Sequence, residues 1–310
     1  MNLSDKVLVL GATGLLGQAL IKELAAQNFS NVLCPGHDEL ELLDQTQTIE
    51  YFKKNSPDVV ILAAAKVGGI SANMNYGADF ILENLRIQQN CFEAALKVNV
   101  KKFLFIGSSC IYPKNCLQPI KEEYLLTSEL EITNEPFAIA KIAGLKMAES
   151  IRNQYGKNYF TVMPTSMYGI NDNFDSENGH VIPSLISRFH EIIKSNEQDF
   201  YVWGTGKAKR EFLYVDDMAK ACLFLLSSSK SLPPYINAGY GEDISIGELA
   251  VMIAKKMNFK GNILFDQTRP DGTMRKILDS SKIFEMGWSP KTSLSDGLDL
   301  VIESYLKKNH

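Results

Sequence analysis

The sequence lacks the features that mark several large classes of protein. Basic residues are in slight deficit, since 32 Lys and Arg against 36 Asp and Glu give a net charge of −4 at pH 7. This balance excludes a general attraction to nucleic acid or anionic membranes. No uninterrupted apolar run approaches the roughly 18 residues that a membrane-spanning helix needs. The apolar N-terminal stretch is broken by glycines, and no small-residue cleavage site follows it. We therefore expect a cytoplasmic protein without nucleic acid or membrane partners.

Cysteine is scarce, and its few positions carry no motif. The five cysteines are scattered, odd in number and without C-x-x-C spacing. This pattern argues against both a disulfide framework and a zinc site, and it fits a reducing compartment. We therefore predict no metal site. The chain also has no repeat, low-complexity tract or flexible linker, so its 310 residues suit one large domain, or a domain with a smaller lobe packed against it.

The first half of the chain alternates short apolar runs with helical patterns. The runs are hydrophobic almost throughout, as expected of parallel strands that are covered on both faces. The expected strands are 6–10, 31–34, 58–64, 102–109 and 159–165, and the expected helices lie near 15–27, 46–54, 79–98 and 137–155. Repeated β–α–β units with right-handed crossovers predict an α/β fold with a Rossmann-type doubly wound parallel sheet.

The pattern loosens after residue 165. Residues 169–180 are polar and flanked by glycine, which predicts a long surface loop. The later elements are strands at 200–204 and 235–239 and helices near 182–194, 215–228, 245–257 and 293–307. We predict a main domain of residues 1–165, to which residues near 211–238 return. A smaller α/β lobe of residues 166–310 would pack against it, with a cleft between the two.

A glycine-rich turn directly follows the first expected strand and opens a helix. In the run Gly11-Ala12-Thr13-Gly14-Leu15-Leu16-Gly17, the first glycine permits a tight turn and the third allows close packing of helix and strand. The second lets a diphosphate approach the backbone, and the helix N-terminus favours phosphate. The turn therefore predicts a dinucleotide site.

The end of the second strand should decide which dinucleotide binds. A carboxylate there would bind an adenosine ribose diol, whereas an arginine would favour a 2′-phosphate. The sequence instead has Pro35, Gly36 and His37. His37 either contacts a phosphate or is an ordinary loop residue, and Asp38 is a weakly supported diol partner. The choice between NADP and NAD stays open on these residues alone.

Polar side chains also follow the fourth strand. Ser108 and Ser109 stand where strand ends of such a sheet face the ligand crevice, so their hydroxyls could reach a substrate carbonyl, although serines there are as often turn formers. Further along, Phe137 lies four residues before Lys141 at the start of an expected helix. A tyrosine in place of Phe137 would form a proton-donating pair with that lysine.

Six motifs together resemble one enzyme family. They are the glycine turn, "GSSCIYP" (107–113), "NEPFAIAKIAG" (134–144), "HVIPSLI" (180–186), "WGTGKAKREFLYVDDMA" (203–219) and "RPDGTMRKILD" (269–279). The set is similar to the extended short-chain dehydrogenases/reductases and, more closely, to the GDP-L-fucose synthase family of epimerase/reductases. The resemblance implies a Rossmann domain that binds NADP(H), a smaller lobe that binds a GDP-linked 4-keto sugar, and a homodimer.

The resemblance implies catalytic roles for five positions. Ser108 would hydrogen-bond the C4 carbonyl of the sugar, and Lys141 would bind the nicotinamide ribose. Cys110 would be the epimerisation base and His180 its partner acid, because protons on C3 and C5 are acidified by the neighbouring C4 ketone. Phe137 occupies the position of the family's proton-donating tyrosine.

The resemblance also implies two sets of binding residues. The cofactor set is Gly11, Thr13, Gly14, Leu15, Leu16, Gly17, Ala63, Ala64, Lys141 and His180. The substrate set is Ser109, Ser166, Arg188, Trp203, Lys209, Arg210 and Arg275. Arginine forks suit phosphate oxygens, and Arg210 ranks first because the motif around it is nearly intact.

Three departures from the family pattern bear on function. Phe137 lacks the hydroxyl of a tyrosine. Ser166 stands where the family commonly has asparagine, and the loop before His180 differs in composition, which bears on the identity of the sugar. Arginines for a 2′-phosphate are absent from the glycine turn and from residues 34–38, which bears on NADP(H) against NAD(H).

Because the flanks of Phe137 keep the family pattern, we interpret it as an engineered Tyr→Phe replacement, with natural divergence as the alternative. The predicted function is an NADP(H)-dependent GDP-4-keto-sugar 3,5-epimerase/4-reductase whose reduction step is impaired. Two other functions remain open. One is a 4-reductase for a GDP-4-keto-heptose, with or without epimerisation. The other is a non-catalytic dinucleotide-binding protein that lost its tyrosine.

Overall fold

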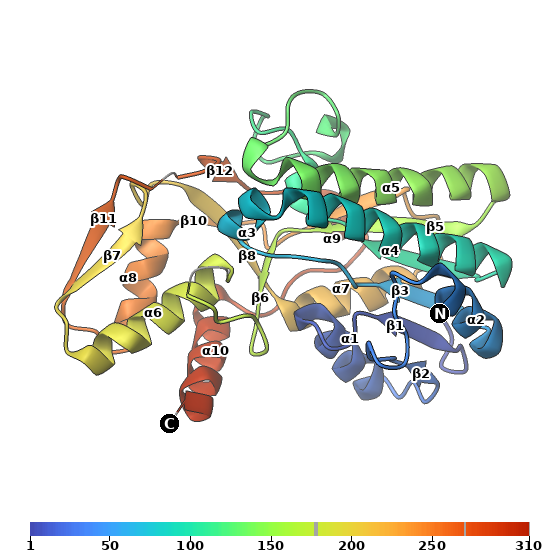
Figure 1. The fold of residues 1–310 in the computed structure, drawn as a ribbon, viewed down its shortest axis with the longest axis horizontal. Helices are drawn as coiled ribbons and strands as arrows, with labels where there is room; N and C mark the ends of the chain where they lie inside the picture. The colour runs from blue at the N-terminus through green and yellow to red at the C-terminus, as the bar shows by residue number, and fades with distance from the viewer. Residues whose placement is uncertain (177–178, 270, 310) are drawn as a thin grey trace.

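The structure is a computed structural model that describes residues 1–176, 179–269 and 271–309 (Figure 1). Glu177 and Asn178 of the predicted loop, Pro270 of the last motif and the terminal His310 lie outside the described residues. Among the described residues, no helix combines the length and the apolar character needed to cross a membrane.

A six-stranded parallel sheet forms the centre of the larger domain. Its spatial order is β2 (Val32–Leu33), β1 (Val7–Leu10), β3 (Val59–Leu62), β4 (Lys102–Ile106), β5 (Asn158–Pro164) and β9 (Tyr235–Ala238). β1 and β3 are buried along their whole length, which explains why their sequences are apolar at every position. The strand order reverses at β1, and in such sheets ligands bind at the carboxyl ends of the strands near the reversal.

Helices cover both faces of this sheet (Figure 1). One layer is α1 (Leu15–Ala26) and α7 (Val215–Ser227), and the other is α2 (Gln45–Asn55), α4 (Gly77–Lys97) and α5 (Glu135–Tyr155). Alternate residues of β1 serve the two layers, since Val7 and Val9 pack in the core on the α1 and α7 side, and Leu8 and Leu10 in the opposite core. The three layers confirm the predicted α/β fold with a doubly wound parallel sheet.

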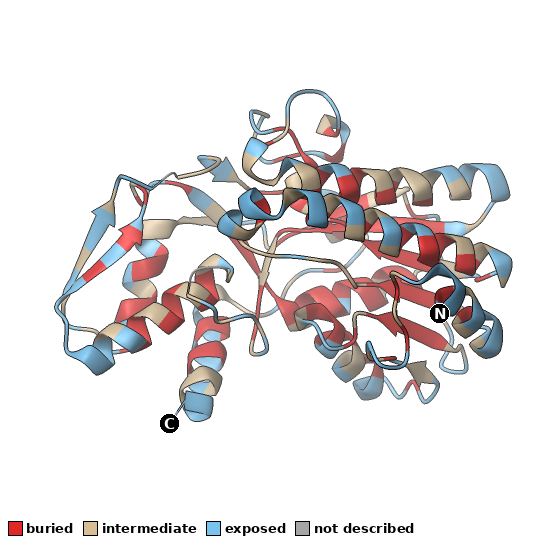
Figure 2. Ribbon diagram, in the orientation of Figure 1, coloured by how far each residue is buried: buried red, intermediate tan, exposed pale blue. Residues whose placement is uncertain are grey.

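The smaller lobe lies at the other end of the molecule (Figure 1). Its strands are β6 (Ser166–Tyr168), β7 (Asp199–Trp203), β8 (Lys209–Tyr214), β10 (Asp243–Ser245), β11 (Asn262–Asp266) and β12 (Arg275–Lys276). β8 pairs with β6, β10 and β12, whereas β7 pairs only with β11. The helices α6 (Val181–Ser195), α8 (Ile246–Lys256) and α10 (Leu294–Asn309) enclose a separate core (Figure 2). We propose the domain division predicted above, because α7 and β9 belong to the larger domain.

Residues 109–134, between β4 and α5, form a segment that we call the strap. It holds three short 3₁₀ turns, Ser109–Ile111, Glu122–Tyr124 and Ile132–Asn134. The strap also pairs with the chain after β12, since the Ile120 amide donates to the Ile277 carbonyl at 2.8 Å and the Asp279 amide donates to the Ile120 carbonyl at 2.8 Å. The strap therefore joins the two lobes. Two further short helices are α3 (Ile70–Asn75) and α9 (Ser281–Glu285).

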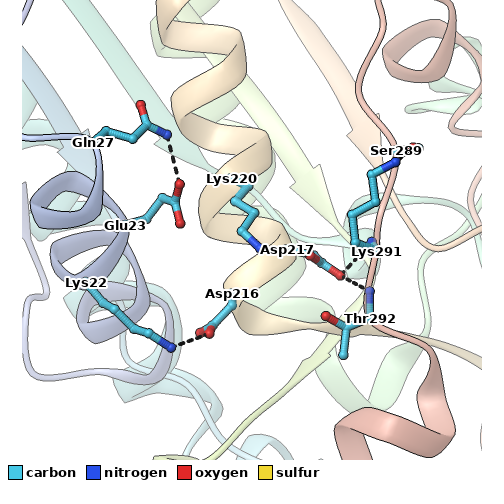
Figure 3. A network of polar contacts seen from close by, with 9 residues as sticks. All are labelled: Lys22, Glu23, Gln27, Asp216, Asp217, Lys220, Ser289, Lys291 and Thr292. Atoms are coloured by element: carbon cyan, nitrogen blue, oxygen red, sulfur yellow. Dashed lines mark hydrogen bonds and ion pairs between the residues drawn. The ribbon is translucent and has the colours of Figure 1, made fainter.

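A carboxylate at the start of α7 ties the two lobes together (Figure 3). Asp217 is 1% exposed and accepts hydrogen bonds from the amides of Lys291 at 2.9 Å and Thr292 at 2.7 Å. Its neighbour Asp216 forms an ion pair at 2.6 Å with Lys22 of α1. A buried carboxylate is stable when backbone donors satisfy it, so Asp217 fixes the chain before α10 against the larger domain.

Two expected strands end two or more residues earlier than predicted. The strand expected at 58–64 stops at Leu62, because Ala63 and Ala64 turn to pack against the glycine loop. The strand expected at 102–109 stops at Ile106, because the Ser108 hydroxyl accepts from the Cys110 amide at 3.2 Å and caps a 3₁₀ turn. Both corrections lie at strand ends, where residues leave the sheet toward the cleft.

Candidate active site

The glycine loop between β1 and α1 divides into two packed glycines and one open glycine. Gly11 has φ +87°, and a Cβ there would lie 2.5 Å from the Ala64 amide nitrogen. A Cβ on Gly17 would lie 2.0 Å from the Gly11 carbonyl oxygen. A Cβ on Gly14, in contrast, would meet only the Gly11 oxygen at 3.4 Å. Protein packing therefore explains Gly11 and Gly17, whereas Gly14 leaves backbone accessible at the N-terminus of α1, as a phosphate requires.

A small hollow lies beside this loop. It is lined by Leu10, Gly11, Ala12, Thr13, Pro35, Gly36, His37, Leu40, Leu42 and Ala64. The mixture of apolar side chains and backbone groups suits the adenosine end of a dinucleotide. The His37 side chain is 85% exposed, and its Nδ1 lies 3.6 Å from a Glu41 carboxylate oxygen. Asp38 is exposed.

Ser108, Ser109 and Cys110 lie at the carboxyl end of β4, which neighbours β3 in the sheet. Ser109 is buried, whereas Ser108 and Cys110 are partly exposed. Cys110 Sγ receives two side-chain contacts, from Asn134 Nδ2 at 3.4 Å and from Lys276 Nζ at 3.8 Å. The sequence interpretation did not single out Asn134 or Lys276, although both lie inside quoted motifs.

Lys141 lies beneath this strand end, on the inner face of α5. Its Nζ donates to the Ile106 carbonyl oxygen at 2.8 Å and lies 4.8 Å from the centroid of the Phe105 ring and 5.8 Å from that of Phe137. Burial lowers the pKa of Lys141 to about 7. No carboxylate pairs with it in the described parts of the chain. A ligand hydroxyl could therefore contact Lys141 Nζ without competing with a carboxylate.

Phe137 occupies the first turn of α5, one helical turn before Lys141. It is 9% exposed and packs edge-on against Phe80 of α4, with ring centroids 6.2 Å apart. Positions four apart on a helix share a face, so Phe137 and Lys141 point to the same side of α5. The Phe137 ring, which carries no hydroxyl, therefore lies beside the Lys141 ammonium.

His180 begins α6, in the smaller lobe. Its Nδ1 lies 3.4 Å from Asp172 Oδ1, and the Asp172 side chain is 4% exposed while that of His180 is 46% exposed. The hydrogen bond to Asp172 raises the pKa of His180. The imidazolium therefore persists to higher pH, as a proton donor requires. Asp172 is a further residue that the sequence interpretation missed, because a carboxylate in a polar loop carries no signal by itself.

Two clusters of cationic side chains face the predicted sugar-nucleotide region. Arg188 stacks its guanidinium 4.8 Å from the Phe200 centroid and 5.4 Å from that of Trp203, while Arg269 lies 4.9 Å from the same Trp203 ring. Trp203 is 40% exposed. Arg269 had not been singled out from the sequence. The cluster can offer both an aromatic face and guanidinium donors to a nucleotide.

The second cluster is centred on Arg210 of β8. Its Nη1 donates to the Lys209 carbonyl at 2.8 Å and its Nη2 to the Asp271 carbonyl at 3.4 Å. Burial lowers the pKa of the guanidinium, and no carboxylate pairs with it among the described residues. Lys209 is exposed and likewise lacks an ion pair there. These two cations remain available to an anion.

The other two predicted substrate residues are held by the smaller lobe's own sheet. Arg275 Nε forms an ion pair with Asp243 Oδ2, whose side chain is 8% exposed. Ser166 opens β6 and pairs with Phe212 of β8. Arg275 is therefore less free than Arg210 to bind an anionic ligand.

Comparison with known proteins gives a consistent picture. Residues 7–247 match the model of the NAD dependent epimerase/dehydratase family. The chain is 49% identical over 304 residues to GDP-L-fucose synthase 1 of Arabidopsis thaliana, covering 98% of this chain and 94% of that protein. It is 45% identical over 311 residues to GDP-L-fucose synthase of Escherichia coli strain K12, covering 98% and 97%.

A solved structure extends the likeness to the fold. The GDP-mannoheptose C4 reductase from Campylobacter jejuni with NADP bound matches with a TM-score of 0.89 and 35% identity, covering 99% of each chain. Together with the motifs and their placement at the strand ends, these similarities show that the chain belongs to the NAD dependent epimerase/dehydratase family and, within it, to the GDP-L-fucose synthase family.

Proposed function

We propose that the protein is an NADP(H)-dependent GDP-4-keto-sugar 3,5-epimerase/4-reductase. The observation that carries the proposal is the placement of Ser108, Cys110 and Lys141 around the carboxyl end of β4, in the same sheet as the glycine loop of β1. The GDP-L-fucose synthases that the chain resembles make, by name, a GDP-linked sugar. Incubation with candidate GDP-4-keto sugars in deuterated water tests both epimerisation and reduction.

In the proposed epimerisation, Cys110 is the base and His180 the acid. The thiolate removes a proton from C3 or C5, and the C–H electrons move toward the C4 carbonyl to give an enolate. The Ser108 hydroxyl donates to the enolate oxygen. His180, whose pKa is raised by its hydrogen bond to Asp172, returns a proton from the opposite face. No step of this sequence uses Phe137.

The reduction step requires a hydride and a proton. A bound reduced nicotinamide supplies the hydride to C4, and the alkoxide that develops on O4 must be protonated. Lys141 would hold the nicotinamide ribose, and the ring at position 137 carries no hydroxyl to deliver the proton. We propose that Phe137 leaves epimerisation intact and impairs reduction, whether the phenylalanine was engineered or arose by divergence. A tyrosine codon in the source gene would support the first origin.

We propose NADP(H) as the cofactor. The open backbone at Gly14 fits a diphosphate, and the adjoining hollow fits an adenosine. The similar heptose reductase has NADP bound. The residues proposed to hold it are Gly11, Thr13, Gly14, Leu15, Leu16, Gly17, Ala63, Ala64, Lys141 and His180. The choice needs a test because Pro35, Gly36 and His37 stand where an arginine for the 2′-phosphate was expected. Tighter binding of NADH than of NADPH would contradict it.

Gly14→Val should weaken NADPH binding without changing the stability of the fold. A Cβ on Gly14 would meet only the Gly11 oxygen, at 3.4 Å, and Gly14 has φ −76°, so the protein should fold with nearly unchanged stability. Its methyl groups occupy the approach of the diphosphate, so NADPH affinity should fall at least ~10-fold, about the loss of one charge-assisted hydrogen bond. Isothermal titration and thermal unfolding measure the two effects.

Gly17→Ala is the matched comparison for that experiment. Its Cβ would lie 2.0 Å from the Gly11 oxygen, so this smaller change should destabilise the protein itself. Unchanged NADPH affinity in Gly14→Val would show that the loop does not bind phosphate in the proposed way.

Arg210→Ala should weaken binding of the GDP-sugar by about 1.5–3 kcal/mol, the scale of a charge-assisted hydrogen bond. The guanidinium is held by two backbone carbonyls and lacks a carboxylate partner among the described residues, so it can meet the diphosphate. Arg275→Ala should cost less affinity, because Asp243 already neutralises Arg275. Calorimetry with GDP and with NADPH distinguishes a nucleotide-sugar contact from a general defect. Equal GDP affinity in Arg210→Ala and the parent protein would transfer the role to Arg188 or Lys209.

We propose a cytoplasmic homodimer formed through α4 and α5. The two helices lie close together, since a Cβ on Gly144 would be 2.4 Å from Gln88 Oε1 and Gln88 Nε2 donates to the Ala140 carbonyl at 2.7 Å. Their outer faces expose apolar side chains, including Leu82 at 58% and Ile139 at 42%. Such faces are commonly covered by a second subunit.

A second candidate function is a GDP-4-keto-heptose 4-reductase. The likeness to the Campylobacter jejuni heptose enzyme favours it, as does Ser166 in place of asparagine beside the sugar. The higher identity to the GDP-L-fucose synthases favours a 6-deoxyhexose. Parallel assays with both classes of GDP-sugar discriminate them.

A further inference from the structure

We propose that Lys276, assisted by Asn134, is a positioning residue that holds the Cys110 sulfur in its anionic, proton-accepting form. The thiolate is the basic form of cysteine. The inference concerns how the base is generated and rests on the proposed function for its catalytic meaning. Its consequence is that the base on the larger domain is completed by a residue of the smaller lobe.

The contacts at the Cys110 sulfur carry the proposal. Two nitrogen donors converge on Sγ, the Lys276 ammonium at 3.8 Å and the Asn134 amide at 3.4 Å. A thiol sulfur is a weak acceptor, whereas a thiolate attracts a cation and accepts several hydrogen bonds. Two nitrogen donors pointing at one sulfur therefore fit a thiolate better than a neutral thiol.

The Lys276 ammonium is not paired with a carboxylate in the described residues, although its charge also acts on the Cys116 thiol. It takes part in none of the ion pairs with Asp or Glu there, and Sγ is the one side-chain acceptor that its ammonium contacts. The side chain is only partly exposed. A half-buried ammonium is stabilised by a nearby negative charge, and the Cys110 thiolate would supply it.

The backbone around Lys276 is fixed from both sides. In the β12–β8 pair, Lys276 lies opposite Arg210. The next residue, Ile277, receives a hydrogen bond from the Ile120 amide at 2.8 Å and donates to Gln118 Oε1 at 3.0 Å. Gln118 and Ile120 belong to the strap that also contains Cys110. The same hydrogen bonds that join the lobes therefore set the distance between ammonium and sulfur.

Other charges also face this cluster. Glu131 of the strap is paired with Lys114 at 3.2 Å and accepts from the Thr273 hydroxyl at 3.3 Å. The titratable groups around this cluster are Lys276, Arg210, Glu131, Lys114, Asp271 and Cys116; Arg210 interacts with Cys110, Asp271 and Glu131, and Lys276 also acts on Cys116. Arg210 donates to backbone carbonyls, and Lys276 is the cation whose ammonium lies within contact distance of Sγ, at 3.8 Å.

The first test measures the sulfur without any sugar. Iodoacetamide alkylation of the full-length protein is followed across pH by mass spectrometry of the Cys110 peptide, with exposed Cys34 as an internal reference. Lys276→Met should slow alkylation of Cys110 at neutral pH about 10-fold and move the midpoint of the profile upward by at least ~1 pH unit, the effect of removing an adjacent opposite charge. Lys276→Arg should keep both near the parent values.

Two further variants control this measurement. Lys207→Met removes an exposed lysine of the same lobe without contact to Cys110, so it should leave the profile unchanged. Asn134→Ala removes the neutral donor and should shift the profile in the same direction as Lys276→Met, by a smaller amount. It also tests the proposal if Lys276→Met does not fold. An unchanged Cys110 profile in Lys276→Met, or in Asn134→Ala if only that variant folds, overturns the inference.

The second test measures catalysis. For deuterium exchange into a GDP-4-keto sugar, Lys276→Met should lower kcat with little change in KM, and Lys276→Arg should restore much of kcat. A raised KM with unchanged kcat and an unchanged alkylation profile would make Lys276 a substrate-binding residue and overturn the proposal. Exchange that is absent from the parent protein with every candidate sugar, together with a shifted alkylation profile, would refute the proposed function and leave the role of Lys276 at the thiolate standing.

Discussion

Phe137→Tyr should raise the rate of NADPH-dependent reduction of the correct GDP-4-keto sugar at least ~10²-fold, the low end expected for a positioned proton donor. Hydride addition to C4 develops negative charge on O4, and Phe137 has no proton to give. The new hydroxyl would share the inner face of α5 with Lys141. Loss of NADPH absorbance under single-turnover conditions measures the change.

The state of Lys141 explains why the pair should work only together. Burial lowers the lysine pKa to about 7, so at neutral pH a large fraction is uncharged in the present protein. An adjacent phenolate would favour the ammonium and raise that pKa, and the ammonium in turn would favour loss of the phenol proton. The ammonium would thus lower the pKa of the phenol toward neutral pH, where a phenol alone would keep its proton.

A double variant checks this coupling. At saturating NADPH, which offsets the lost contact with the nicotinamide ribose, Lys141→Met should remove most of the gain when combined with Phe137→Tyr. At the same NADPH concentration it should change the slow reduction by the parent protein little, because no phenol is present there. Thermal unfolding of each variant separates lost activity from lost structure. If Phe137→Tyr leaves reduction unchanged with 6-deoxyhexose and heptose substrates alike, the impaired-reductase proposal fails.

Sequence patterns predicted the elements whose burial is either complete or regularly periodic. β1 and β3 are apolar at every position because helices cover both faces, and α6 shows an apolar stripe with a polar outer face. The strands β6, β8, β10, β11 and β12 were not predicted. β8 begins with the charged residues Lys209 and Arg210, and β11 is largely exposed. Neither strand therefore shows the regular pattern of buried and exposed residues by which a strand is recognised from sequence.

The residues of the candidate site likewise fall into those that the sequence predicted and those that it did not. The glycine loop, Ser108, Cys110 and Lys141 lie next to strand and helix boundaries that local sequence defines, and motif resemblance directed attention to them. The contact between Cys110 and Lys276 spans 166 positions and depends on pairing of the strap with the chain after β12. The ion pair of Arg275 with Asp243 likewise depends on two strands flanking β8. Such contacts are set by tertiary pairing, which residue types and spacing do not specify.

Cys110→Ala should abolish exchange of the sugar C3 and C5 protons with solvent deuterium, lowering its rate by about 10²- to 10⁴-fold, the range for a positioned general base. The parent protein should show this exchange while oxidising NADPH very slowly, because epimerisation needs Cys110, His180 and a polarised carbonyl but no hydroxyl at position 137. Mass spectrometry of the recovered GDP-sugar counts the incorporated deuterium.

The effect should be the same in the Phe137→Tyr background, where Cys110→Ser should also suppress exchange because a hydroxyl is a far weaker base than a thiolate. Cys116→Ala is the matched control: Cys116 is a half-buried cysteine of the same strap, and burial raises the pKa of its thiol. Its loss should leave exchange intact.

Since Ser108 and Lys141 are untouched by the Cys110 variants, Cys110→Ala combined with Phe137→Tyr should still reduce a 4-keto sugar that needs no inversion. Full deuterium exchange in Cys110→Ala would assign the base to another residue, whereas loss of reduction together with exchange would point to a collapsed site.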